Sequence, residues 1–150
     1  MNKSIKINIP ADADGYVLLK CQYCGNFFKI IPADIDDERL LNIYCPSCGL
    51  VSSSYLTDDV YNLVDAKVTN FANDIIDDFI NKIERMSNKN MTIKGTNKQK
   101  KVYEKPIRPI IDTLEIARFN CCNRSAKIKP LLKFTGCYCP FCGVKNDEIE

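Results

Sequence analysis

The first third of the chain alternates apolar and polar residues in short runs. Ile5, Ile7 and Ile9 alternate with polar neighbours, and a turn-rich segment follows at residues 10–15. Four further runs with apolar character lie at residues 16–20, 27–31, 40–44 and 51–56. Alternation at period two, interrupted by Gly, Pro and Asp, is typical of antiparallel strands joined by turns. The pattern therefore predicts a small all-strand domain over residues 1–56.

The apolar period changes after residue 56. Apolar side chains then recur at steps of three or four residues, at Val60, Val64, Val68, Phe71, Ile75, Phe79, Ile83 and Met86. This spacing predicts one long amphipathic helix over residues 57–88, with Thr57 as its N-cap. Thirty helical residues span about 45 Å, which is longer than a small strand domain can cover. We therefore expect a second copy of the chain or a partner protein to cover the stripe, by contacts with Val64, Val68, Phe71, Ile75, Phe79 and Ile83. The alternative is that the C-terminal part of the chain covers it.

Four of the nine cysteines form two CxxC pairs in the strand-rich part of the chain. Cys21 and Cys24 form the first pair, and Cys45 and Cys48 form the second, with twenty residues between the pairs. Two such pairs are the ligand set of a tetrahedral structural zinc site. Disulfides are disfavoured because the cysteine count is odd and the N-terminus has no apolar signal-peptide core. We predict that these four cysteines bind one structural Zn²⁺.

The C-terminal third repeats this pattern in altered form. An offset of 98 residues aligns Cys24 with Cys122, and an offset of 94 aligns the closing CPxCG sequence at Cys45 with that at Cys139. The repeat predicts a second zinc ribbon over residues 114–150, with a loop four residues shorter.

One ligand of the second ribbon is displaced, because the repeat places Phe119 where the first ribbon has a cysteine. The fourth thiolate can come from Cys121, which lies within the knuckle (the tight turn that carries a pair of ligands), or from Cys137, which by strand alternation points to the same face as Cys139. We predict a second structural Zn²⁺ bound by Cys121, Cys122, Cys139 and Cys142, with Cys137 as the alternative to Cys121. A different interpretation is that this group has lost its metal and its cysteines pack as small apolar side chains.

These motifs resemble a known family. The stretch from Ile7 to Val51 is similar to the TFIIB-type zinc ribbons of bacterial and archaeal proteins, through the CxxCGxxFKI run at Cys21–Ile30 and the CPxCG at Cys45–Gly49. Residues 114–145 resemble the family more loosely. The resemblance implies a three-stranded antiparallel ribbon around a structural zinc. It implies no reaction and no partner, because ribbons serve many functions.

Charge divides the chain more sharply than its formal net charge of +2 suggests. Residues 1–88 carry a net charge of −5, and residues 89–145 carry +10. Seven of the basic residues lie at positions 89–108, which predicts a mobile basic linker. The chain has no run of eighteen apolar residues, so we expect no membrane partner and a cytoplasmic location.

The basic second half suggests nucleic-acid binding, because exposed rings stack on bases while cations neutralise phosphate. The candidate contacts are Lys98, Lys100, Lys101, Arg124, Lys127 and Phe141. The competing interpretation is that the lysines are a solvated linker and the rings are core.

Catalysis is disfavoured by the composition. The chain has no histidine, which removes the commonest general base, and a zinc ion held by four cysteines has no open coordination position. We expect no small-molecule substrate.

Together these patterns predict a small metal-bound α+β protein in which two three-stranded antiparallel zinc ribbons are joined by one long amphipathic helix and a basic linker. The expected divisions are residues 1–56, 57–88, 89–113 and 114–150. We expect a non-catalytic zinc-binding adaptor that contacts nucleic acid through its basic half. The alternative is an assembly subunit that acts through the helix at residues 57–88 and makes no nucleic-acid contact.

Overall fold

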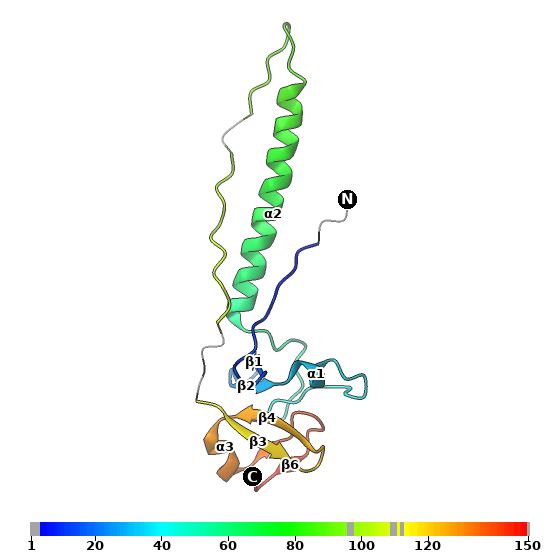
Figure 1. The fold of residues 1–150 in the computed structure, drawn as a ribbon, viewed down its shortest axis with the longest axis vertical. Helices are drawn as coiled ribbons and strands as arrows, with labels where there is room; N and C mark the ends of the chain where they lie inside the picture. The colour runs from blue at the N-terminus through cyan, green and yellow to red at the C-terminus, as the bar shows by residue number, and fades with distance from the viewer. Residues whose placement is uncertain (1–3, 96–97, 109–110, 112, 150) are drawn as a thin grey trace. The chain divides into compact units, whose positions relative to one another are not determined.

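The computed structural model describes residues 4–95, 98–108, 111 and 113–149. The chain forms two compact units, one made of Met1–Asn8 and Asp59–Pro106 and the other of Ile9–Asp58 and Ile107–Glu150. The elements, all but β5 labelled in Figure 1, are β1 (Val17–Lys20), β2 (Phe27–Ile30), α1 (Pro32–Ile35), α2 (Asp58–Arg85), β3 (Glu115–Phe119), β4 (Arg124–Ile128), α3 (Pro130–Thr135), β5 (Cys137–Tyr138) and β6 (Lys145–Asn146). An α+β class is therefore confirmed.

The second unit contains a four-stranded antiparallel sheet in the order β1-β2-β4-β3. The hairpins β1–β2 and β3–β4 come from the two sequence repeats, and they join where Lys29 on β2 pairs with Lys127 on β4. β5 and β6 form a separate two-stranded sheet, and the equivalent part of the first repeat has only the bridge between Tyr44 and Val51. The two separate three-stranded ribbons predicted from the sequence are thus not what the described residues form.

Both repeats contribute to one hydrophobic core. Apolar residues at alternating strand positions point to the same face of the sheet, as the period of two requires. The buried members are Leu19, Phe28, Ile30, Tyr55, Ala117, Phe119, Ala126, Ile128, Cys137, Cys139 and Phe141. A single hairpin of this size buries too little apolar surface to be stable alone, and pairing the repeats offsets that deficit.

The first unit is built around α2, which lies within the predicted range of residues 57–88. The chain reverses direction after α2 through a turn at Asn88 and Met91, whose backbones exchange hydrogen bonds of 3.0 and 3.2 Å. The Ser87 hydroxyl then contacts both backbone groups of Ile93, at 2.9 and 3.2 Å. These contacts end the helix and direct the following segment back along it (Figure 1).

Residues 98–106 lie against α2, although the sequence predicted a mobile linker there. The Asn70 side chain accepts a hydrogen bond from the Val102 backbone N–H at 2.7 Å and donates to the Val102 carbonyl at 2.9 Å. It also donates to Glu104, which lies 3.6 Å from the Lys67 ammonium group. The segment is therefore held by specific contacts. Residues 109, 110 and 112 of the predicted linker lie outside the described residues.

Two smaller expectations differ from the structure. The alternating isoleucines at residues 5, 7 and 9 form no strand in the described part of the chain, and residues 40–43 have no strand pairing. No helix among the described residues is both long and apolar enough to cross a membrane.

Candidate metal centres

The described residues contain two groups of four cysteines whose sulfur atoms lie close together. Cys21, Cys24, Cys45 and Cys48 form the first group, with all four sulfurs within 4.8 Å of one another. The Sγ atoms of Cys21 and Cys48 are 3.7 Å apart, and those of Cys24 and Cys45 are 3.5 Å apart. A disulfide would need about 2.0 Å, and all nine cysteines are free thiols.

These spacings fit a tetrahedral zinc site. Four sulfurs at about 2.3 Å from a central Zn²⁺ lie about 3.8 Å from one another. The first group can therefore hold one metal ion with little rearrangement. Cys21 and Cys45 are fully buried, whereas the side chain of Cys24 is exposed. The ion would thus lie at the margin of the fold, with its buried side facing the common core.

Backbone N–H groups prepare each closing knuckle for a negatively charged sulfur. The N–H groups of Ser47 and Cys48 point at the Cys45 thiol, and that of Leu50 points at Cys48. Burial raises the pKa of Cys45, and the N–H groups of Ser47 and Cys48 oppose that increase. A divalent cation lowers the pKa of a coordinating thiol strongly enough to deprotonate it. The site therefore suits a thiolate-bound dication.

The second group reproduces this arrangement with one ligand displaced. Cys121, Cys122, Cys139 and Cys142 have their sulfurs within 4.8 Å of one another, and the Cys121 and Cys142 sulfurs are 3.6 Å apart. The N–H groups that point at Cys139 and Cys142 come from the positions equivalent to those of the first site. A second metal ion therefore fits as well as the first.

The structure separates the two candidates for the fourth ligand. Cys121 lies in the second group, whereas Cys137 belongs to neither group of described cysteines and is 1% exposed in the common core. Burial raises the pKa of Cys137 to about 11, as expected for a thiol that packs as an apolar side chain. Phe119 takes the place of the missing ligand and packs edge-on against Phe141, with ring centroids 6.3 Å apart. This geometry favours Cys121.

The two closing knuckles contact each other reciprocally. Tyr44 donates its backbone N–H to the Pro140 carbonyl at 2.8 Å, and Tyr138 donates its own to the Pro46 carbonyl at 2.9 Å. The Tyr138 ring lies on Gly49, so close that a Cβ added there would be 2.8 Å from the ring. The Tyr44 ring lies on Gly143 in the same way. The two candidate metal centres therefore belong to one pseudo-symmetric body.

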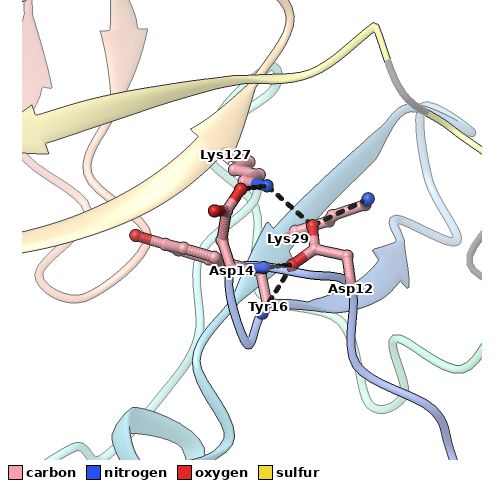
Figure 2. Close-up of polar contacts among 5 residues, drawn as sticks. All are labelled: Asp12, Asp14, Tyr16, Lys29 and Lys127. Carbon is pink, nitrogen blue, oxygen red and sulfur yellow. Dashed lines mark hydrogen bonds and ion pairs between the residues drawn. The ribbon is translucent and has the colours of Figure 1, made fainter.

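A cluster of charges closes the junction between β2 and β4 on the face opposite the core (Figure 2). Lys29 and Lys127, which are 2% and 8% exposed, both donate to one oxygen of Asp12, at 3.0 and 2.7 Å. Lys127 also donates to Asp14 at 2.5 Å, and Asp12 accepts a 3.0 Å bond from the Tyr16 backbone N–H. Two like charges directly opposite each other destabilise a sheet, and the Asp12 carboxylate between the two ammonium groups offsets that repulsion. No pattern in the sequence pointed to this role of Asp12.

Three of the six candidate nucleic-acid contacts are engaged inside this unit. Lys127 is in the charge cluster, and the carboxylates of Asp12 and Asp14 raise its pKa. Arg124 forms ion pairs with Asp34 at 3.0 Å and with Asp37 at 2.5 Å, and its guanidinium lies 5.6 Å from the centre of the Phe141 ring. Phe141 is 5% exposed. The exposed candidates, Lys98, Lys100 and Lys101, belong to the other compact unit.

The predicted interaction residues of α2 are partly exposed. Val68 and Ile75 are each 49% exposed and Phe79 is 62% exposed, while Val64, Phe71 and Ile83 are half-buried. Sequence reasoning missed Asn70, which is buried on the opposite side of the helix and holds residues 98–106, the return segment. An isolated asparagine in a helix carries no pattern that could have indicated this role.

Comparisons of the chain with protein-family models, with curated proteins and with solved structures find no match.

Proposed function

We propose that this chain is a non-catalytic adaptor in which two structural zinc ions stabilise the paired hairpins and α2 docks on another protein chain. The observation that carries the docking role is the exposure of Val68, Ile75 and Phe79 along one side of α2. At 3.6 residues per turn these three side chains point about 140–180° away from Asn70, the residue that holds the return segment. The contacts of Asn70 and these three side chains thus occupy opposite sides of the helix, whereas Ile83 at the C-terminal end of the stripe lines a hollow with Ile93 and Gly95 of the same chain.

The stripe offers enough apolar surface for a specific contact. Fully burying a Val, Ile or Phe side chain contributes about 1.5–3 kcal/mol. Because two of these side chains are about half exposed and Phe79 is more than half exposed, covering each would contribute roughly 1 kcal/mol. Phe71 and Ile83, which are half-buried, would add smaller amounts. A linear apolar face of this kind is typical of helices that dock on a groove or on another helix.

The zinc ions have a structural role in this proposal. Each group supplies four thiolates, which fills the tetrahedral shell and leaves no position for a substrate or a reactive water. Each metal ion would be bound by cysteines from both ends of a repeat, and would thereby link the hairpin to the closing knuckle. Removing the metal should therefore unfold the unit that contains both groups.

A photo-crosslinking experiment tests the docking role. A benzoylphenylalanine placed at Ile75 should form an adduct with a protein when the chain is irradiated in the cells that produce it. The same probe at Asn81, which is exposed on the side of the return segment, should not. Adduct formation at Ile75 should also be lost in Phe79→Glu. Equal adducts at both positions, or none at either, would contradict the proposal.

Nucleic-acid binding is a second candidate, supported by one segment only. Lys98, Lys100 and Lys101 are exposed, and Tyr103 beside them is 79% exposed. A titration of labelled oligonucleotides at several salt concentrations tests it. Each lost phosphate contact reduces the slope of log K against log salt by about 0.7–0.9, so neutralising all three lysines should reduce it by about 2–3. No binding at low salt would exclude this candidate.

A further inference from the structure

The stripe on α2 has the same spacing when it is read from either end. Val64, Val68 and Ala72 are separated by steps of four, and after a step of three Ile75, Phe79 and Ile83 are again separated by steps of four. Val68, Ala72, Ile75 and Phe79 are exposed, and Val64 and Ile83 are half-buried. Two such helices aligned antiparallel about a point between residues 73 and 74 would place each of these six side chains opposite another of the six, and would place Phe71 opposite Ile76.

The sizes of these side chains favour that antiparallel alignment. It places Val64 opposite Ile83, Val68 opposite Phe79 and Ala72 opposite Ile75, so that each smaller side chain faces a larger one. A parallel alignment would place Phe79 against Phe79 and Ala72 against Ala72, which crowds one layer and leaves a gap in another. Apolar interfaces pack best when large and small residues alternate across facing positions.

The charges at the two ends of the stripe favour the same alignment. Asp58, Asp59 and Asp65 lie near the N-terminal end of α2 with one lysine, Lys67, which gives a net charge of −2, and the last turn carries Lys82, Glu84 and Arg85, which gives +1. An antiparallel pair brings the acidic end of one helix close to the basic end of the other, and it also opposes their dipoles favourably. A parallel pair would bring like charges together at both ends.

We infer that the protein chain that docks on α2 is a second copy of this chain, joined as an antiparallel homodimer through the stripe. The inference rests on the proposed function, in that it names the partner for the docking surface. The contact from Val64 to Ile83 would extend over about 29 Å of each helix. The same patch serves both copies, as in other two-fold symmetric dimers.

Cross-link mapping on the purified, zinc-loaded chain tests the inference. Isotopically labelled and unlabelled chains are mixed, irradiated with a benzoylphenylalanine at Phe79, digested, and analysed by mass spectrometry. The adduct should join the two isotopic forms and map to the peptide around Val68, and the mass in solution should be twice the 17.1 kDa of one chain. An adduct at Phe79 of the other copy would overturn the antiparallel alignment.

Two substitutions give a matched and independent test. Ala72→Phe should weaken the dimer at least about tenfold, because the new ring meets Ile75 of the other copy. Adding Ile75→Ala should restore much of the affinity, and Asn81→Phe on the opposite side should leave it unchanged. A parallel dimer would instead be strengthened by Ala72→Phe. A monomer at all concentrations would overturn the homodimer, whereas an Ile75 adduct with a different protein in cells would leave the adaptor role intact.

Discussion

Gly49→Ala should destabilise the protein much more than Gly25→Ala, although the two glycines have the same backbone role. Each follows the second cysteine of a knuckle, each has a φ of 72°, and each donates its N–H to the carbonyl of the first cysteine. Their surroundings differ. A Cβ at Gly25 meets nothing within 4 Å, whereas a Cβ at Gly49 would lie 2.8–3.0 Å from three atoms of the Tyr138 ring. The pair therefore isolates the contact between the two repeats.

The expected losses of stability follow from two costs, that of the left-handed backbone and that of the close contact with the ring. A left-handed backbone conformation costs a non-glycine residue about 1–2 kcal/mol, which both variants incur. Overpacking a rigid site adds typically about 1–3 kcal/mol, which Gly49→Ala alone incurs. We expect a loss of about 1–2 kcal/mol for Gly25→Ala and about 2–5 kcal/mol for Gly49→Ala. The backbone that carries the ring cannot shift freely, because the Tyr138 N–H donates a hydrogen bond to the Pro46 carbonyl.

The assay is denaturant unfolding at a fixed, saturating concentration of free zinc, extended to a double-mutant cycle with Tyr138→Ala. Once the ring is removed, Gly49→Ala should cost no more than Gly25→Ala. Equal losses for the two glycine variants in the wild-type background would refute the reasoning. So would a cost of Gly49→Ala that is unchanged by Tyr138→Ala.

Three further predictions concern other parts of the molecule. Cys121→Ser should lower the zinc content from two ions to about one, whereas Cys137→Ser should keep both ions and only lower stability. Loss of an ion from Cys137→Ser in a metal analysis would instead make Cys137 the fourth ligand. Burial alone would raise the pKa of Asp12, but its hydrogen bonds with Lys127, the Tyr16 N–H and Lys29 outweigh burial and lower it. The ionised Asp12 carboxylate therefore stabilises the fold at pH values above its unfolded pKa of about 4, and this stabilisation is lost as the pH falls below that value. Asp12→Asn should therefore cost about 3 kcal/mol at pH 7 and less in acid, and a pH-independent cost would contradict this role. Asn70→Ala should release the return segment, so the Val102 amide should exchange with solvent faster, and unchanged protection would show that other contacts hold it.

The metal groups were the most predictable part of the structure, because ligand spacing is written directly into the sequence. Cysteines at CxxC spacing can converge on one point only if a tight turn separates them, and the two knuckles of the first group do so. The displaced ligand was less predictable. Both Cys121 and Cys137 satisfied the spacing, and only the packing of the core places Cys137 away from the other sulfurs.

The joining of the two hairpins could not be predicted from the pattern. Alternation at period two shows which face of a strand is buried, but it does not identify the neighbouring strand. Lys29 and Lys127 fall on the face that the pattern assigns to solvent, yet they are buried, and Asp12 accepts a hydrogen bond from each of them. The prediction of nucleic-acid contacts in the basic half met a similar limit, because a sequence pattern does not show which side chains are neighbours in the fold. A sum of charges does not show that Arg124 already faces two carboxylates within the fold.

The contacts between the predicted linker and α2 could not be predicted for a related reason. Its lysines and low apolar content are typical of a solvated chain, yet one side chain, Asn70, satisfies both backbone groups of Val102 and holds it on α2. Propensity and composition describe what a segment prefers alone. They do not include a hydrogen bond from a residue 32 positions away.

A titration with Co²⁺ tests whether the chain binds two metal ions through eight cysteines, because this ion replaces zinc in tetrahedral thiolate sites and reports its ligands in the visible and near-ultraviolet spectrum. The apo chain should show the absorption of tetrahedral cobalt with four thiolates, and the signal should saturate at two equivalents for each chain, one for each group of four cysteines. Zinc should then displace the cobalt. Saturation at fewer than two equivalents, or a spectrum of six-coordinate cobalt with oxygen ligands, would contradict the assignment of two structural metal centres.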